Sequence, residues 1–214
     1  MKVISHIVTP KQKRIKLSRT CVDKLKKMSR LSYVNRWEYA GKIEDDILTY
    51  VTSKSRYSVK SEDIEKVWYS VIGFHTHPGL GQDYESITEN IPIYTTLPSP
   101  CDFEAYIKGF PDMQCNILCD AHGYYMIDII NSANQNTCPL PEAVNDYMSG
   151  IRSTPFMRIN AFSEDGLEYF HTTLKNWKRE INEKVDPEML KLFGISIRYY
   201  GYDDEPPILT IYEA

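Results

Sequence analysis

The chain has 214 residues, of which 42% are hydrophobic and 25% charged, a composition typical of a globular protein that buries its own core. A formal net charge of −4 argues against nucleic-acid binding, so the short basic cluster at residues 11–16 is expected to be a solvated approach to the first helix. Because no apolar run reaches the ~18 residues of a membrane span, and no secretion signal is recognisable, we expect no membrane association. The five cysteines are odd in number and irregularly spaced, which favours a reducing, cytoplasmic location.

The first half of the chain predicts one helix followed by strands. Val22, Leu25 and Met28 have helical spacing, and Ser18 or Thr20 could cap the helix. Two β-type runs then flank an acidic turn and predict a hairpin. A nearly unbroken β-type run follows and ends at a histidine pair. The expected elements are a helix over 21–28, hairpin strands over 37–43 and 47–51, and a strand over 67–75.

The second half alternates between helices and strands after a long insertion. Residues 79–98 are rich in Gly, Pro, Thr and Asn and predict a loop, and loops longer than about 12–15 residues are often functional. Ser99 is the expected N-cap of a helix that includes residues 102–107. The remaining expected elements are a hairpin over 115–120 and 123–130, helices over 139–150 and 163–184, and a terminal hairpin over 195–200 and 208–212.

This pattern predicts a core over residues 1–135 and a C-terminal extension over residues 136–214, with the seam between them in residues 131–155. The extension is expected to contain helices and then a short β-hairpin, which could pack on the core. Cys115 and Cys119 lie near His122, yet in a strand residues four apart are roughly 13 Å apart and do not share one ion. We therefore expect these two cysteines to be buried thiols.

The histidine pair is the most informative feature of the sequence. His75 and His77 end the β-type run, and side chains two apart in a strand lie on the same face. Two imidazoles and a carboxylate from a following loop make a three-ligand site for a zinc-type ion. Such a site leaves a fourth position for water, as catalytic zinc sites do.

The order His75-x-His77-Pro78 and then Ser99-x-x-Asp102 resembles the JAMM (MPN-plus) metallopeptidases, the zinc isopeptidases that include many deubiquitinases. Glu38, with Gly41 three residues later, fits the upstream glutamate of that family. The resemblance covers residues 34–130. It implies an α/β fold in which a mixed β-sheet is flanked by helices, a JAMM/cytidine-deaminase-like core with an α+β C-terminal extension.

The resemblance also implies roles for five residues. His75, His77 and Asp102 would hold a zinc ion (Zn2+), which lowers the pKa of its bound water. Glu38 would take the proton of that water and deliver it to the leaving amine, and Ser99 would donate a hydrogen bond to the oxyanion. The implied activity is hydrolysis of an amide or isopeptide bond that removes ubiquitin or a ubiquitin-like modifier from proteins, with a possible partner subunit.

Three alternatives remain open. Because the serine and aspartate usually follow the second histidine sooner, Ser86 and Glu89 could replace Ser99 and Asp102, although the helix start favours Ser99 and Asp102. The chain could be a catalytically silent MPN-type scaffold that binds partner proteins, but no ligand or base residue is plainly lost. It could be a metalloenzyme that acts on a small molecule, but the motif of a zinc deaminase does not occur.

His171 is expected to face out from, or flank, the helix over 163–184.

Overall fold

The computed structural model describes residues 11–67, 70–79, 89–90, 92–129, 139–153, 160–164 and 167–213. Its centre is a six-stranded sheet with the strand order β10-β7-β6-β4-β2-β3, in which β4 and β6 are parallel and the other neighbours antiparallel. The strands of this sheet are β2 (Ala40–Glu44), β3 (Ile47–Val51), β4 (Ile72–Thr76), β6 (Cys115–Cys119), β7 (Gly123–Ile129) and β10 (Ile195–Gly201). The predicted mixed sheet is therefore confirmed.

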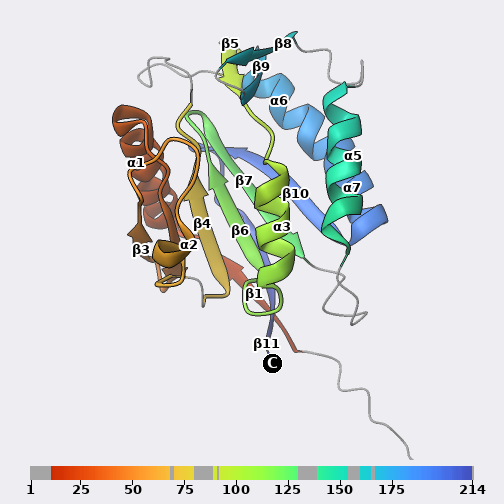
Figure 1. The fold of residues 1–214 in the computed structure, drawn as a ribbon. Coiled ribbons are helices and arrows are strands. Elements are labelled where there is room, and N and C mark those ends of the chain that lie inside the picture. Colours follow the sequence, from red (N-terminus) through yellow and green to blue (C-terminus); the bar gives the residue numbers. More distant parts are fainter. Residues whose placement is uncertain are drawn as a thin grey trace, which may run out of the picture.

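Two smaller sheets lie at opposite ends of the molecule in Figure 1. One has the strand order β5-β9-β8 and the other is the ribbon β1-β11. Their strands are β1 (Lys11–Lys16), β5 (Pro92–Thr95), β8 (Asn160–Glu164), β9 (Leu167–Thr173) and β11 (Ile208–Glu213). The sheet that contains β5 borders the candidate site described below.

Helices flank both faces of the central sheet, as predicted (Figure 1). Helix α1 covers one face, whereas α3, α5, α6 and α7 lie on the other. The helical segments are α1 (Arg19–Asn35), α2 (Ser61–Ile64), α3 (Pro100–Gly109), α5 (Pro141–Ser153), α6 (Leu174–Glu180), the π-helical η2 (Ile181–Val185) and α7 (Asp186–Phe193). Among the described residues, no helix is long and apolar enough to cross a membrane.

Strand β7 shows why helices can cover both faces of the sheet. Every residue of β7 is buried. Its alternating side chains divide between two cores: Tyr124 and Met126 join the core beneath α1, and Tyr125 and Ile127 join the core beneath α3, α5 and α6. A strand that is apolar on both sides belongs inside a layered α/β domain.

The predicted helix over 163–184 is wrong in its first half. Residues 163–164 belong to β8, residues 167–173 form β9, and α6 begins only after Thr173, whose Oγ1 accepts the Asn176 amide N–H at 3.2 Å. The 3–4 spacing of apolar residues misled the prediction, because the aromatic and β-branched residues of 169–173 favour a strand. His171 therefore does not lie on a helix; its ring stacks on Tyr94 of β5 with centroids 4.9 Å apart.

Two further predictions need correction. Strands β10 and β11 do not pair with each other as a hairpin, because β10 pairs with β7 and β11 pairs with β1. The C-terminal region therefore contributes a strand to the central sheet. The predicted loop over 79–98 contains a strand, β5, which pairs with β9. Residues 80–88 and 91 of this loop lie outside the described residues. The same is true of residues 68 and 69 in the predicted strand over 67–75, and of residues 130–138 near the predicted seam.

Candidate metal centre

The histidine pair lies at the end of β4. His75 lies within the strand, which pairs with β2 on one side and with β6 on the other. His77 is the first residue after the strand ends. The His77 amide N–H still donates to the Cys119 carbonyl at 2.8 Å, so the chain keeps its direction past the end of the strand. Both rings therefore lie on the same side, with their Nε2 atoms 3.3 Å apart.

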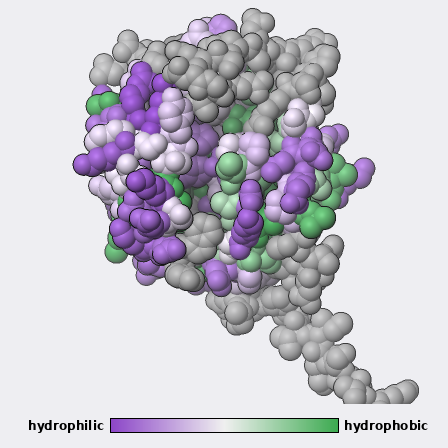
Figure 2. All heavy atoms as spheres, in the orientation of Figure 1, coloured by the Kyte–Doolittle hydropathy of each residue, from purple (hydrophilic) through white to green (hydrophobic). Residues whose placement is uncertain are grey.

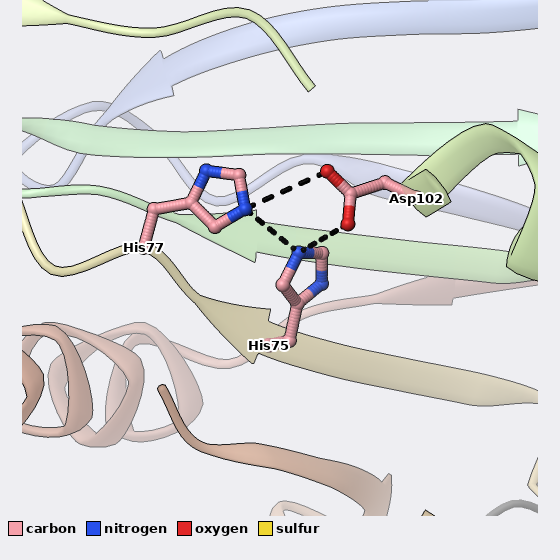
Figure 3. A group of neighbouring side chains, drawn as sticks. All are labelled: His75, His77 and Asp102. Atoms are coloured by element: carbon pink, nitrogen blue, oxygen red, sulfur yellow. Dashed lines mark hydrogen bonds and ion pairs between the residues drawn. The ribbon is translucent and has the colours of Figure 1, made fainter. Parts of the chain in front are cut away.

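Asp102 completes the group from the first turn of α3 (Figure 3). One carboxylate oxygen lies 3.2 Å from His75 Nε2, and the other lies 3.5 Å from His77 Nε2. The ligand-type atoms of the three residues all lie within 4.8 Å of one another. Because imidazole nitrogen and carboxylate oxygen both bind zinc, this set of atoms suits a zinc-type ion.

Ser99 and Asp102 form a capping box that begins α3. Ser99 Oγ accepts the Asp102 amide N–H at 3.2 Å, and the Ser99 amide donates to Asp102 Oδ2 at 2.6 Å. The local roles of an N-cap and a first-turn acid are thus present, and the same bonds fix the Asp102 carboxylate beside the histidines.

The outer ring nitrogens of the two histidines face hydroxyl groups. His75 Nδ1 lies 3.0 Å from Tyr106 Oη, one turn after Asp102 on α3, and His77 Nδ1 lies 3.4 Å from Thr96 Oγ1. A histidine that ligates a metal through one nitrogen commonly uses the other in a hydrogen bond that fixes its tautomer and its orientation. Both rings therefore present Nε2 to the centre of the group.

Glu38 lies just before β2 rather than within a strand over 37–43 as predicted. Backbone hydrogen bonds fix this segment: the Glu38 amide donates to the Ser55 carbonyl at 2.8 Å, and the next residue, Tyr39, accepts the Thr76 amide at 2.9 Å. Thr76 lies between the two histidines in sequence, so this bond attaches the Glu38 segment to the end of β4.

Gly41 explains the spacing of the Glu-x-x-Gly pattern. It lies opposite Phe74 of β4 on one side and opposite Tyr50 of β3 on the other. A Cβ atom at Gly41 would lie 2.2 Å from the Thr49 carbonyl oxygen and 2.5 Å from Phe74 Cε1. Only glycine allows this close approach, which brings the Glu38 segment to the histidines.

Glu38, Ser99 and the three ligand-type residues line one cavity of about 540 Å³. Its walls come from residues 56–59 near α2, from β4, from α3 and from Tyr94 of β5. Figure 2 views this side of the molecule, where side chains over α2 and over α3 border a recess. The volume is typical of a site that binds a small molecule or part of a larger one.

Electrostatics within the cavity couple the acidic groups to the histidines. Burial raises the pKa of Glu38 above its ordinary value, although the nearby His77 and His75 oppose this shift. Burial would also raise the pKa of Asp102, but the charge of His75 and the hydrogen bonds from both histidines hold it well below its usual range. Burial would lower the pKa of His77, but its hydrogen bond to Asp102 and the negative charges of Asp102 and Glu38 raise it.

The structure does not bring Glu89 into this group. Its carboxylate pairs instead with Lys178 Nζ at 2.9 Å, and its proposed companion Ser86 lies outside the described residues. Cys115 and Cys119 are buried thiols without a disulfide, as predicted, and burial raises the pKa of both. His122 is buried at the β6–β7 turn.

Three neighbours of the site were not predicted from the sequence. Tyr106 follows Asp102 by four residues on a predicted helix, and this spacing could have revealed it. Thr96 carried no signal, because its contact with His77 depends on the position of β5. Asp120 is buried at the end of β6, accepts hydrogen bonds from Thr95 and Tyr199, and adds to the negative charge near His77.

Within the described part of the chain, only one group of three or more His, Cys, Asp or Glu residues has ligand atoms close enough together to hold a metal ion. This group is His75, His77 and Asp102. The positions of Glu38 and Ser99 around this group follow from backbone hydrogen bonds and from a helix cap. Comparisons with protein-family models, with curated proteins and with solved structures find no match for this chain.

Proposed function

We propose that this chain is a zinc-dependent hydrolase of amide or isopeptide bonds, a JAMM-type metallopeptidase that removes ubiquitin or a ubiquitin-like modifier from proteins. The finer fold assignment, a JAMM/cytidine-deaminase-like core, is part of the same proposal. The observation that carries it is the convergence of His75, His77 and Asp102 within 4.8 Å in a cavity that Glu38 also lines.

The donor atoms support a metal centre that retains an open position. Two imidazole nitrogens and one carboxylate are three protein ligands, the number typical of catalytic zinc sites. His75 Nδ1 and His77 Nδ1 each have a hydroxyl neighbour, so Nε2 is the atom that each ring would give to a metal. When bound, zinc would supply Lewis acidity and a nucleophilic hydroxide at neutral pH.

Glu38 supports the assignment of a general base. Its carboxylate interacts electrostatically with both histidines and with Asp102, and burial raises its pKa. A carboxylate with a raised pKa is better suited to accept a proton at neutral pH and to return it to a leaving amine. Other groups hold the backbone of Glu38: its amide N–H donates to the Ser55 carbonyl, and its carbonyl accepts the Thr52 hydroxyl.

Ser99 supports the assignment of an oxyanion donor. Its Oγ accepts the Asp102 amide N–H, which leaves the hydroxyl hydrogen for a bond to a substrate in the cavity. A hydroxyl that is fixed by a helix cap is oriented before the substrate arrives, which is the property that makes such donors effective.

The test is incubation of the purified protein with a panel of ubiquitin and ubiquitin-like conjugates, with and without a chelator. We expect cleavage of at least one conjugate, loss of cleavage with the chelator, and recovery on addition of zinc. Cleavage that persists in the chelator would contradict the zinc mechanism. A protein whose melting temperature responds to neither zinc nor chelator would instead support the partner-binding scaffold.

A further inference from the structure

The two histidines of the metal centre are oriented by different parts of the chain. His75 lies within β4, and its outer nitrogen faces Tyr106 of α3. His77 lies beyond the strand, and its outer nitrogen faces Thr96, which directly follows β5. The orientation of the His77 ring therefore depends on where the chain holds Thr96.

A series of hydrogen bonds leads from Thr96 to the C-terminal region. The Thr96 carbonyl accepts a hydrogen bond from Tyr125 Oη at 2.7 Å. The same Oη accepts the indole N–H of Trp177 on α6 at 2.9 Å. Tyr125 and Trp177 are both fully buried, so the hydrogen bond between them is shielded from water.

Strand pairing holds the same segment from a second direction. Strand β5 pairs with β9, and Thr95 lies opposite Phe170. The ring of Phe170 packs against Trp177 with centroids 5.4 Å apart. The ring of Tyr125 is in turn held edge-on by Tyr199 of β10, with centroids 4.7 Å apart. Thr96 is thus fixed by β9, α6 and β10, all from residues 167–201.

We propose that Tyr125 and Trp177 are positioning residues of the metal centre, which fix Thr96 and through it the orientation of His77. The C-terminal region is then a structural part of the centre, and not only an extension packed on the core. The inference rests on the proposed metal site, and it concerns the support of one ligand rather than the chemistry of the site.

Tyr125 and the neighbouring Tyr124 provide a matched pair of variants. Both side chains are fully buried in β7, and they point to opposite faces of the sheet. Among the residues that the structure describes, Tyr124 Oη has no hydrogen-bond partner, whereas Tyr125 Oη links Trp177 to Thr96. Tyr124→Phe and Tyr125→Phe therefore each remove one buried hydroxyl from the same strand, and only the second removes a support of Thr96.

The experiment measures the Co2+ and Zn2+ dissociation constants of the full chain by competition with a chromophoric chelator, together with the visible spectrum of the Co2+ form. We expect Thr96→Val to weaken binding about 10-fold, within the range for residues that support metal ligands. Tyr125→Phe should weaken binding several-fold and alter the Co2+ spectrum. Tyr124→Phe should match the wild type, and Thr96→Ser, which keeps the hydroxyl, should restore most of the affinity.

The outcomes separate this inference from the proposed function. Wild-type protein that binds neither metal would overturn both. Wild-type protein that binds metal, with equal affinities and spectra in Tyr125→Phe and Tyr124→Phe, would overturn the positioning role alone. If Tyr125→Phe is too unstable to purify, the Thr96→Val and Thr96→Ser pair decides, and equal affinities in these two variants would contradict the proposal.

Discussion

Ser99 and Asp102 hold each other through two hydrogen bonds, one from each amide to the side chain of the other residue. This box begins α3 and at the same time directs the Asp102 carboxylate toward His75 and His77. A common device for starting a helix therefore also fixes the third ligand of the proposed metal centre. Substitution of Ser99 therefore affects both the helix and the site.

Ser99 is both a helix cap and the proposed oxyanion donor, and two measurements on the same variants report the two roles. Ser99→Ala removes the cap and the proposed oxyanion donor, so we expect a loss of about 1 kcal/mol in unfolding free energy and a fall of about 10²–10³-fold in kcat. Ser99→Thr keeps both functions and should retain most of the activity and stability. Chemical denaturation and steady-state kinetics check the two effects. A kcat for Ser99→Ala within a few-fold of wild type would exclude Ser99 as the oxyanion donor.

Substitution of Tyr106 tests the support of His75. Tyr106→Phe removes the hydroxyl that lies 3.0 Å from His75 Nδ1 and keeps the ring that packs beside Phe103. We expect zinc affinity to fall about 10-fold because the orientation of the His75 ring is less restricted. Tyr124→Phe serves as the control, and equal affinities in the two variants would contradict the assignment.

The charge of Asp102 predicts a pH-dependent contribution to the stability of the metal-free protein. The folded pKa of Asp102 is lowered, so its contribution is present above the ordinary value of 3.8 and is lost as the pH falls through the folded pKa. The folded pKa of His77 is raised, so its contribution is present below 6.5 and is lost as the pH rises through the folded pKa. The pair should therefore stabilise the fold most between these two values.

Asp102→Asn tests this expectation, because asparagine can still accept the Ser99 amide N–H and only the charge is removed. In chelator, the variant should lose on the order of 1 kcal/mol more unfolding free energy at about pH 5.5 than at about pH 9. Denaturant titration at both pH values measures the difference, with the exposed Asp112→Asn as the control. A loss that is equal at both pH values would show that the ion pair does not form.

Substitution of Glu38 should lower activity without lowering the zinc content, unlike substitution of a proposed metal ligand. Glu38→Gln keeps the size of the side chain but removes the proton acceptor, so we expect kcat to fall about 10²–10⁴-fold with zinc content unchanged. Glu44→Gln, at the exposed end of the same strand region, is the matched control and should be fully active. Activity retained in Glu38→Gln would assign the general base to another residue.

The positions of the three proposed metal ligands could be predicted because each depends on local geometry. The two-residue period of a strand puts His75 and His77 on one face, and the helix-start pattern directs Asp102. The approach of the Glu38 segment to the histidines depends on Gly41, and this glycine is part of the Glu-x-x-Gly pattern in the sequence.

The support of His77 could not be predicted, because it depends on pairing between distant segments. Thr96 is held by Tyr125 and by the pairing of β5 with β9, and β9 itself has apolar residues that mimic a helix over 163–184. Similarly, the terminal runs have the composition of a hairpin, but β10 buries both faces beside β7 and β11 pairs with β1. Which strand each segment pairs with decides between these arrangements. The pairing partners are distant in sequence, so a local stretch of sequence does not reveal them.

The decisive measurement is a zinc titration of metal-free wild-type protein and of Asp102→Asn, with bound zinc quantified by mass spectrometry. A centre made by His75, His77 and Asp102 predicts one zinc per chain in the wild type and binding at least about tenfold weaker in the variant, since the charged ligand is lost. Wild-type protein that binds no zinc, or a variant that binds it with unchanged affinity, would contradict the metal centre proposed for this chain.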